Sequence, residues 1–174
     1  FGIVTILKYP RGDGLMHWTY GGSYETSRPR SRYARFTGDR LPPLKEWPQT
    51  SPSGAMRYES GAFGEEYRGN IFTAHFNTHV VTRNAITRDG GAWKVTQEET
   101  FVRSESTNCR FTDVLEDADG SLLVVNTGGW FRIGCPTSQV AEGPLTGAIY
   151  RVRKVGQHRQ DDPRGANIAW KDAS

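Results

Sequence analysis

Two histidines near the middle of the chain, His75 and His79, are four residues apart. A β corner between them could turn both imidazoles toward one metal ion, because neutral imidazole is a common zinc ligand. A zinc site also needs further ligands at characteristic spacing, and the sequence offers no third one there. We therefore expect packing or surface roles for both histidines, and no metal site.

A run of acidic residues follows later in the chain: Asp113, Glu116, Asp117 and Asp119. Such carboxylates could bind calcium, but the run lacks the alternating Asp/Asn positions, the central glycine and the later glutamate of a calcium loop. Asp119 and Gly120 form a pair that is typical of a tight β-turn. The sequence therefore favours a structural role for Asp117 and Asp119.

The composition limits the class of protein. The chain has 174 residues, of which 36% are hydrophobic and 24% charged, which is typical of one folded domain and not of a disordered tail. The 20 glycines and 9 prolines favour turns over long helices. The longest apolar run, Leu122 to Val125, is far shorter than the roughly 20 residues that span a bilayer, so we expect no transmembrane segment.

A cluster of arginines between Arg28 and Arg40 could contact nucleic acid. No nucleic-acid motif accompanies the cluster, and the prolines and glycine in and beside it predict a solvated loop. With a net charge of only +3, we expect no nucleic-acid partner.

Short stretches rich in β-branched and aromatic residues recur between turn signals, which predicts an all-β fold. Gly69 to Phe76 and His79 to Ile86 should pair as a hairpin, and the region from Trp93 to Val102 should add a more polar strand.

The clearest pattern is a second hairpin. Phe111 to Asp117 and Leu122 to Asn126 should pair through the Asp119-Gly120 turn, and Gly147 to Arg153 should follow as a third strand.

A weak internal repeat suggests how these strands are organised. The segments that begin at Gly69 and Gly120 are similar at an offset of 51 residues, and propeller blades recur at roughly 40 to 50 residues. A β-sandwich is the competing architecture. We expect about three blades over 1–155, interrupted by a long loop at 9–52, and an exit segment over 156–174. Because Phe1 to Lys8 already looks like a strand, we interpret the chain as a fragment.

Several longer stretches resemble a known family. The sequences F-G-E-E-Y-R-G-N-I-F-T-A-H-F-N-T (63–78), F-T-D-V-L-E-D-A-D-G-S-L-L-V-V-N-T-G-G-W-F (111–131) and G-C-P-T-S-Q (134–139) are similar to a membrane-bound dehydrogenase family. That family is similar in turn to the glucose/sorbosone dehydrogenases. The resemblance implies the C-terminal half of a six-bladed β-propeller with a periplasmic or otherwise extracytoplasmic location.

The resemblance also implies a chemistry. In quinoprotein sugar dehydrogenases a pyrroloquinoline quinone accepts a hydride from the substrate, and arginines bind its carboxylates as two-pronged donors. The sequence R-F-T-D resembles the R-I-R-D of those enzymes, which makes Arg110 and Asp113 the candidate cofactor-binding residues. Thr112 replaces the second arginine. An alternative is that Arg110 is a solvated cation at the start of a strand.

Trp130 and Phe131 are the candidate substrate-binding residues, because aromatic rings over a propeller mouth can stack on sugars. The alternative is that they fill the core under a long loop. Cys109 and Cys135 flank the same blade, and an extracytoplasmic location would permit a disulfide between them. Two buried free thiols are the competing interpretation.

Two functions are consistent with these residues. The first is part of a quinone-dependent enzyme that oxidises a hydroxyl or aldehyde group of a sugar or polyol, with an unknown catalytic residue in missing blades. The second is a non-catalytic propeller that binds carbohydrate or docks a c-type haem partner. Many relatives carry a c-type haem domain, but this chain has no C-x-x-C-H motif, so we expect no haem in it.

Overall fold

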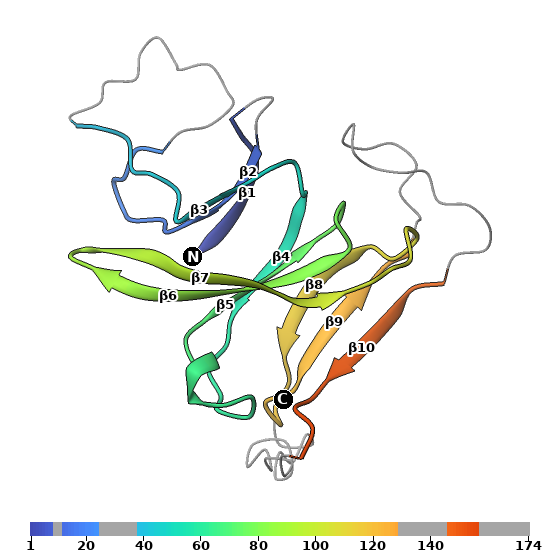
Figure 1. Ribbon diagram of the computed structural model, residues 1–174. Coiled ribbons are helices and arrows are strands. Elements are labelled where there is room, and N and C mark those ends of the chain that lie inside the picture. Colours follow the sequence, from blue (N-terminus) through green and yellow to red (C-terminus); the bar gives the residue numbers. More distant parts are fainter. Residues whose placement is uncertain (9–11, 25–37, 129–145, 157–174) are drawn as a thin grey trace, which may run out of the picture.

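The computed structural model describes residues 1–8, 12–24, 38–128 and 146–156. These residues form ten β-strands and one short 3₁₀-helix, and no α-helix occurs among them (Figure 1). The elements are β1 (Gly2–Lys8), β2 (Gly12–Met16), β3 (Lys45–Trp47), β4 (Pro52–Arg57), η1 (Glu65–Tyr67), β5 (Ile71–His75), β6 (Val80–Asp89), β7 (Ala92–Arg103), β8 (Phe111–Glu116), β9 (Leu122–Asn126) and β10 (Ala148–Val152).

The strands form three antiparallel sheets whose members follow one another in sequence. The first sheet is β1-β2-β3, the middle sheet is β4-β5-β6-β7, and the third is β8-β9-β10. Each sheet is a simple meander, as in successive propeller blades. The structure thus confirms the predicted all-β class, both predicted hairpins and the third strand at β10. The repeat is also confirmed, since Gly69 and Gly120 each precede the second strand of their sheet.

The prediction of one long loop from Tyr9 to Pro52 was wrong at two places. β2 and β3 lie within that stretch and pair with each other, with Gly14 opposite Glu46. The sequence of β2, G-D-G-L-M, has weak intrinsic strand propensity. Burial outweighs that weakness, because Leu15 and Met16 are completely inaccessible to solvent.

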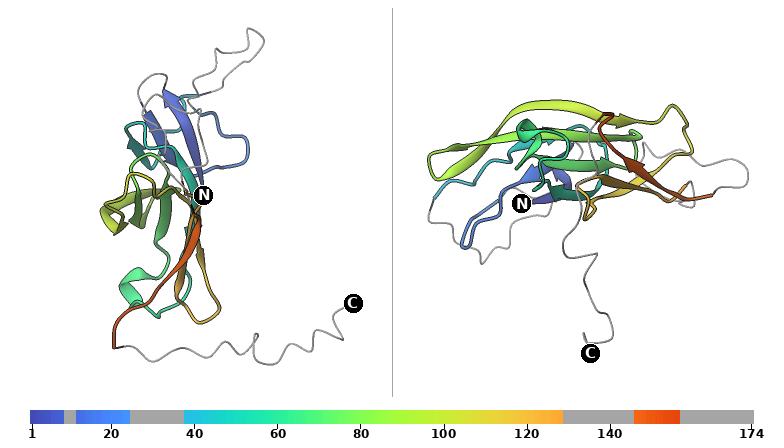
Figure 2. Two further views of the ribbon diagram at one scale, coloured as in Figure 1. Left: turned by 90° about the vertical axis from the view of Figure 1, so that its right-hand side faces the viewer. Right: turned by 90° about the horizontal axis from the view of Figure 1, so that it is seen from below.

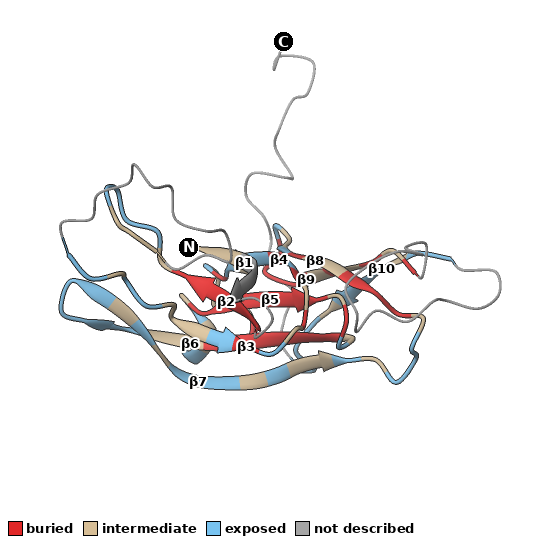
Figure 3. Ribbon diagram, turned by 90° about the horizontal axis from the view of Figure 1, so that it is seen from above, coloured by how far each residue is buried: buried red, intermediate tan, exposed pale blue. Residues whose placement is uncertain are grey.

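The main core lies between the middle and third sheets. Val114 pairs with Val124, both are fully buried, and both contact the aromatic cluster around Tyr58 and Phe72. Figure 3 shows the buried residues concentrated on the inner strands, while β7 is largely exposed. A smaller core joins the first and middle sheets through Leu15, Trp47 and Ile71.

A long hairpin strengthens the contact between the first two sheets. β6 and β7 have 10 and 12 residues, at least twice the length of β5, and extend alongside the first sheet (Figures 1 and 2). The indole nitrogen of Trp47 donates to Glu98 on β7 at 2.6 Å, and Lys45 pairs with the same carboxylate at 3.4 Å. These contacts fix the first sheet against the middle sheet.

The first strands of the three sheets lie side by side, because β1 contacts β4 and β4 contacts β8. Close approach of β4 and β8 depends on Gly54, where a Cβ atom would lie 2.7 Å from the Cα of Asp113. Within the described residues, no helix is long and apolar enough to cross a membrane.

Candidate functional site

The candidate site lies at one end of the sheets, which we call the loop end. β4, β6 and β8 begin at this end, and β5, β7 and β9 finish there, as the pairs Pro52–His75, Val80–Arg103 and Phe111–Asn126 show. Three described connections meet there: 48–51, 76–79 and 104–110. Arg110 and Asp113, the predicted cofactor-binding residues, therefore lie in and next to the loop end.

Arg110 is buried, with only 1% of its surface exposed. Its backbone N–H donates to Asn126 Oδ1 at 2.7 Å, which anchors the start of β8 to the end of β9. Its Nη1 donates to the Phe76 carbonyl at 3.5 Å, and the guanidinium lies over the Phe76 ring. Burial lowers the pKa of Arg110, although a guanidinium keeps its charge. This burial contradicts the alternative that Arg110 is a solvated cation at the start of a strand, and the side chain does not point into open space.

His79 lies beside Arg110, although the sequence indicated only a packing or surface role. Arg110 Nη1 is 3.4 Å from Nδ1 and 3.5 Å from Nε2 of the imidazole. Nδ1 is 2.5 Å from the carbonyl oxygen of Cys109, so Nδ1 carries the proton and Nε2 is left as the acceptor. Burial, together with the positive charge of Arg110, lowers the pKa of His79.

Two residues at the loop end have strained backbones. Ser51 and His79 are the non-glycine residues with positive φ in the described chain, at 49° and 58°. Residues in this region are uncommon outside glycine and are held there by their surroundings, which is frequent at functional sites. Asn77, which is buried, bridges the two turns by donating to Ser51 Oγ at 2.8 Å. No sequence pattern could have identified this strain.

Asp113 lies three residues beyond Arg110, against β4. Its Oδ1 accepts the N–H of Val114 at 2.8 Å. Thr112, which stands where the resembling enzymes have a second arginine, has its hydroxyl 3.5 Å from the Val125 carbonyl. The three residues therefore supply one guanidinium, one carboxylate and no second guanidinium.

His75 is separate from this group and fully buried. Its Nδ1 and Nε2 each lie 2.9 Å from a threonine hydroxyl, Thr50 Oγ1 and Thr82 Oγ1, and Trp47 packs edge-on against the ring at 4.7 Å. Burial lowers the pKa of His75 to about 4. The predicted packing role is thus confirmed for His75, and the described residues contain no group of metal ligands.

Trp130, Phe131 and Cys135 lie outside the described residues, so the predicted substrate contacts and the disulfide remain predictions. The other half of the pair, Cys109, is buried beside Arg110, and burial raises the pKa of its thiol.

We expect Cys109 and Cys135 to form a disulfide when the chain is produced in an oxidising compartment. Closing this loop of about 27 residues would stabilise the fold by roughly 3.5 kcal/mol in the chain-entropy model. Intact-mass measurement with alkylation before and after reduction tests the bond. Labelling of both thiols without reduction would show that the bond is absent.

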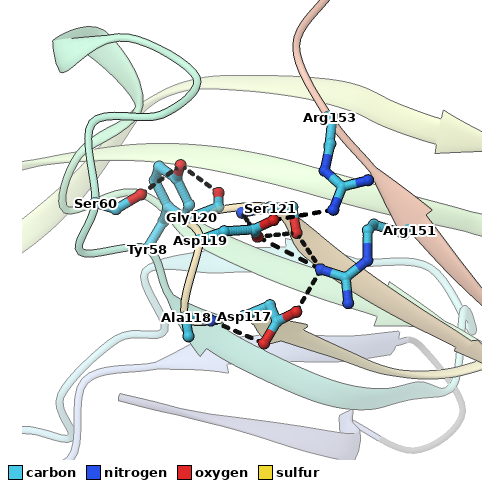
Figure 4. A network of polar contacts seen from close by, with 9 residues as sticks. All are labelled: Tyr58, Ser60, Asp117, Ala118, Asp119, Gly120, Ser121, Arg151 and Arg153. Atoms are coloured by element: carbon cyan, nitrogen blue, oxygen red, sulfur yellow. Dashed lines mark hydrogen bonds and ion pairs between the residues drawn. The ribbon is translucent and has the colours of Figure 1, made fainter. Parts of the chain in front are cut away.

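The opposite end of the third sheet carries a network of charged groups (Figure 4). Asp119, only 8% exposed, accepts hydrogen bonds from Arg153 at 2.9 Å and from the N–H of Ser121 at 3.0 Å. Arg151 on β10 pairs with Asp117 and donates to Ser121 Oγ at 2.6 Å. These partners lower the pKa of both aspartates, Ser121 being the main cause for Asp119 and Arg151 for Asp117.

The same turn is held from the side of the middle sheet. The hydroxyl of Tyr58 donates to the Gly120 carbonyl at 2.7 Å, and burial raises the pKa of this phenol. Glu116 accepts the N–H groups of Glu59 and Ser60 at 2.7 and 2.9 Å. A pocket of about 420 Å³ adjoins these carboxylates. The predicted structural role of Asp117 and Asp119 fits this arrangement.

We expect Asp119→Asn to lower the free energy of unfolding by about 2 kcal/mol, because hydrogen bonds to a buried charged group are stronger than neutral ones. Asp89→Asn is the matched control, since Asp89 makes an exposed pair with Lys94 at 3.7 Å. The control should change stability by less than about 0.5 kcal/mol. Urea denaturation measures both, and equal effects would refute the structural role of the network.

Comparisons with known proteins agree with the propeller class that the three meanders define. A crystal structure from Thermus thermophilus, described as an oxidoreductase (glucose dehydrogenase), matches 81% of this chain at a TM-score of 0.55 and 20% identity. A second structure, described as glucose dehydrogenase, matches 83% at a TM-score of 0.51 and 20% identity. Likeness at this identity shows a shared fold. The chain spans 36% and 38% of the length of these two proteins.

The family is shown by a direct sequence match. Residues 24–133 match the model of the domain of unknown function DUF7133, and the chain belongs to this family. No curated protein sequence matches the chain.

Proposed function

We propose that the chain is part of an extracytoplasmic dehydrogenase-like propeller that oxidises a hydroxyl or aldehyde group of a sugar or polyol with a quinone cofactor. The observation that carries the proposal is the contact of Arg110 with His79 at the loop end, where Ser51 and His79 have positive φ. The glucose dehydrogenase fold of the structural neighbours supports the same class of reaction.

The donor set fits one carboxylate of pyrroloquinoline quinone and not two. The guanidinium group of Arg110 can donate two parallel hydrogen bonds to one carboxylate, but Thr112 has no guanidinium group for a second carboxylate. Because Arg110 is 1% exposed, a carboxylate that pairs with it would have to displace groups that now cover it. When bound, the quinone would supply the hydride acceptor.

The residues of this chain would then bind and orient the ligand. Arg110 would hold a ligand carboxylate in a site from which water is largely excluded, where a charge pair is strong. His79, with its proton fixed on Nδ1 by the Cys109 carbonyl, would present Nε2 as a hydrogen-bond acceptor. Asp113, whose Oδ1 accepts the N–H of the next residue, Val114, would add a carboxylate close to the loop end.

A second candidate function is a propeller that binds carbohydrate or docks a c-type haem domain without catalysis. The burial of Arg110 and the replacement of the second arginine by Thr112 favour it.

Reconstitution of the full-length protein with pyrroloquinoline quinone, followed by dye reduction with a panel of sugars and polyols, separates the two functions. If the protein is such an enzyme, we expect quinone-dependent turnover that falls about tenfold or more in Arg110→Lys. Lysine keeps the positive charge but cannot donate two parallel hydrogen bonds to a carboxylate. Arg68→Lys, an exposed arginine paired with Glu65, is the control. Sugar binding without any turnover would support the second function and refute the first.

A further inference from the structure

A buried carboxylate holds the connection between the first sheet and the middle sheet. Asp13 lies on β2 opposite Trp47, at the loop end, and only 3% of its surface is exposed. Its Oδ2 accepts the N–H of Thr50 at 2.8 Å and the N–H of Ser51 at 2.7 Å. Hydrogen bonds to a charged acceptor are stronger than neutral ones, so these two bonds fix the connection 48–51, which we call the first turn.

The strained backbone of Ser51 depends on this carboxylate. The φ of Ser51 is 49°, in the left-handed region that a serine seldom adopts. A residue stays in this region only where its surroundings hold it there. The bond from the Ser51 N–H to Asp13 fixes the amide on one side of the N–Cα bond, about which φ rotates. Without the carboxylate, Ser51 is free to relax toward a more common conformation.

The first turn holds in its turn the connection 76–79, which we call the second turn. The N–H of Phe76 donates to the carbonyl of Ser51 at 3.0 Å. The N–H of Asn77 donates to the carbonyl of Thr50 at 3.0 Å, and its side-chain amide donates to Ser51 Oγ at 2.8 Å. Because these bonds join the two turns, a change in the first turn moves the second.

The second turn carries the groups that contact the guanidinium of Arg110. The carbonyl of Phe76 accepts from Nη1 at 3.5 Å, and the Phe76 ring lies under the guanidinium. Nδ1 of His79 is 3.4 Å from the same Nη1. The φ of His79 is 58°, so this turn is also held in place by its surroundings. A shift of the second turn would therefore move both rings away from Arg110.

We propose that Asp13 is a positioning residue of the loop end, which keeps Phe76 and His79 against Arg110 through the two turns. Asp13 belongs to the first sheet and Arg110 precedes the third, so the candidate site needs all three sheets. The alternative is that Asp13 only ties the first sheet to the middle one, and a loss of stability alone does not distinguish these roles. Only the use of the site for a quinone rests on the proposed function.

Nuclear magnetic resonance titration of the His79 imidazole, in the full chain without ligand, tests the proposal. Burial is the main cause of the lowered pKa of His79, and the charge of Arg110 contributes to it. We expect Asp13→Asn to raise the pKa of His79 by about 0.5 or more toward 6.5, because the ring becomes more exposed and moves away from the guanidinium. Loss of one signal in His79→Gln identifies the resonance.

Asp119→Asn is the matched control for Asp13→Asn. It alters another buried aspartate that accepts a backbone N–H, but at the opposite end of the sheets. It should leave the pKa of His79 unchanged although it lowers the stability of the chain. If Asp13→Asn does not fold, Ser51→Ala takes its place, because it removes the bond from Asn77 at a half-buried position and should raise the pKa of His79 as well.

An unchanged pKa of His79 in the folded variant, or an equal change in Asp119→Asn, would overturn the proposal. Titration with pyrroloquinoline quinone then tests the part that rests on the proposed function, and we expect binding to weaken about tenfold in Asp13→Asn. Absence of quinone binding by the unaltered protein would refute the proposed function, whereas the His79 measurement would still decide the role of Asp13.

Discussion

Gly54→Ala should lower the free energy of unfolding by about 3 kcal/mol, the upper range for forcing one extra carbon into a packed interior. The added Cβ would lie 2.7 Å from Asp113 Cα and 2.9 Å from the Thr112 carbonyl oxygen. Both are backbone atoms of β8, so the strain can be relieved only by separating β4 from β8. Urea denaturation with a constant m-value measures the loss.

Gly91→Ala is the matched control for this substitution. No heavy atom lies within 4 Å of the position of its Cβ, and its φ is not in the left-handed region. It should therefore be neutral or stabilise the chain by up to about 1 kcal/mol, because alanine restricts the unfolded chain. If Gly54→Ala were as stable as the control, β4 and β8 would not pack as described.

The second large effect is a loss of stability in mild acid that depends on His75. Its pKa is lowered from 6.5 to about 4 in the folded chain, because burial disfavours the charged imidazole. As the pH falls below 6.5, the unfolded chain binds a proton that the folded chain does not, so stability falls until the pH is below about 4. The lowered pKa corresponds to a loss of about 3 kcal/mol in the free energy of unfolding over this pH range.

Denaturation midpoints between pH 7 and pH 4 measure this loss, and His75→Gln should flatten the curve over that range, whatever its stability at pH 7. The lowered pKa of His79 contributes to the loss of stability over the same pH range, so His79→Gln is measured as the companion variant. Asp117 and Asp119 act at lower pH, because their lowered pKa values make their contribution disappear only below about 3.8. An unchanged slope in His75→Gln would contradict the buried, neutral state of His75.

The sequence predicted those parts of the fold that depend on local patterns. Alternating apolar residues and the Asp119-Gly120 turn were enough to identify β8 and β9, since both strand and turn are encoded within a few residues. β2 could not be identified, because its pairing depends on burial against Trp47 and Ile71, which are distant in sequence.

The candidate site was predictable only in part. The R-F-T-D sequence marked Arg110 and Asp113, and the structure places both at or next to the loop end. The sequence alone could not show that Arg110 is buried or that His79 lies beside it, because that contact joins residues 31 positions apart. The positive φ of His79 is likewise a property of the folded backbone, and histidine at such a position has no sequence signature.

We propose that the loop end, through Arg110, binds a carboxylate-bearing quinone. The most direct measurement is equilibrium titration of the folded protein with pyrroloquinoline quinone, followed by absorbance, with Arg110→Lys and the control Arg68→Lys in parallel. We expect saturable binding that weakens about tenfold or more in Arg110→Lys and is unchanged in the control. No saturable binding, or equal affinity of the Arg110→Lys variant and the unaltered protein, would contradict it.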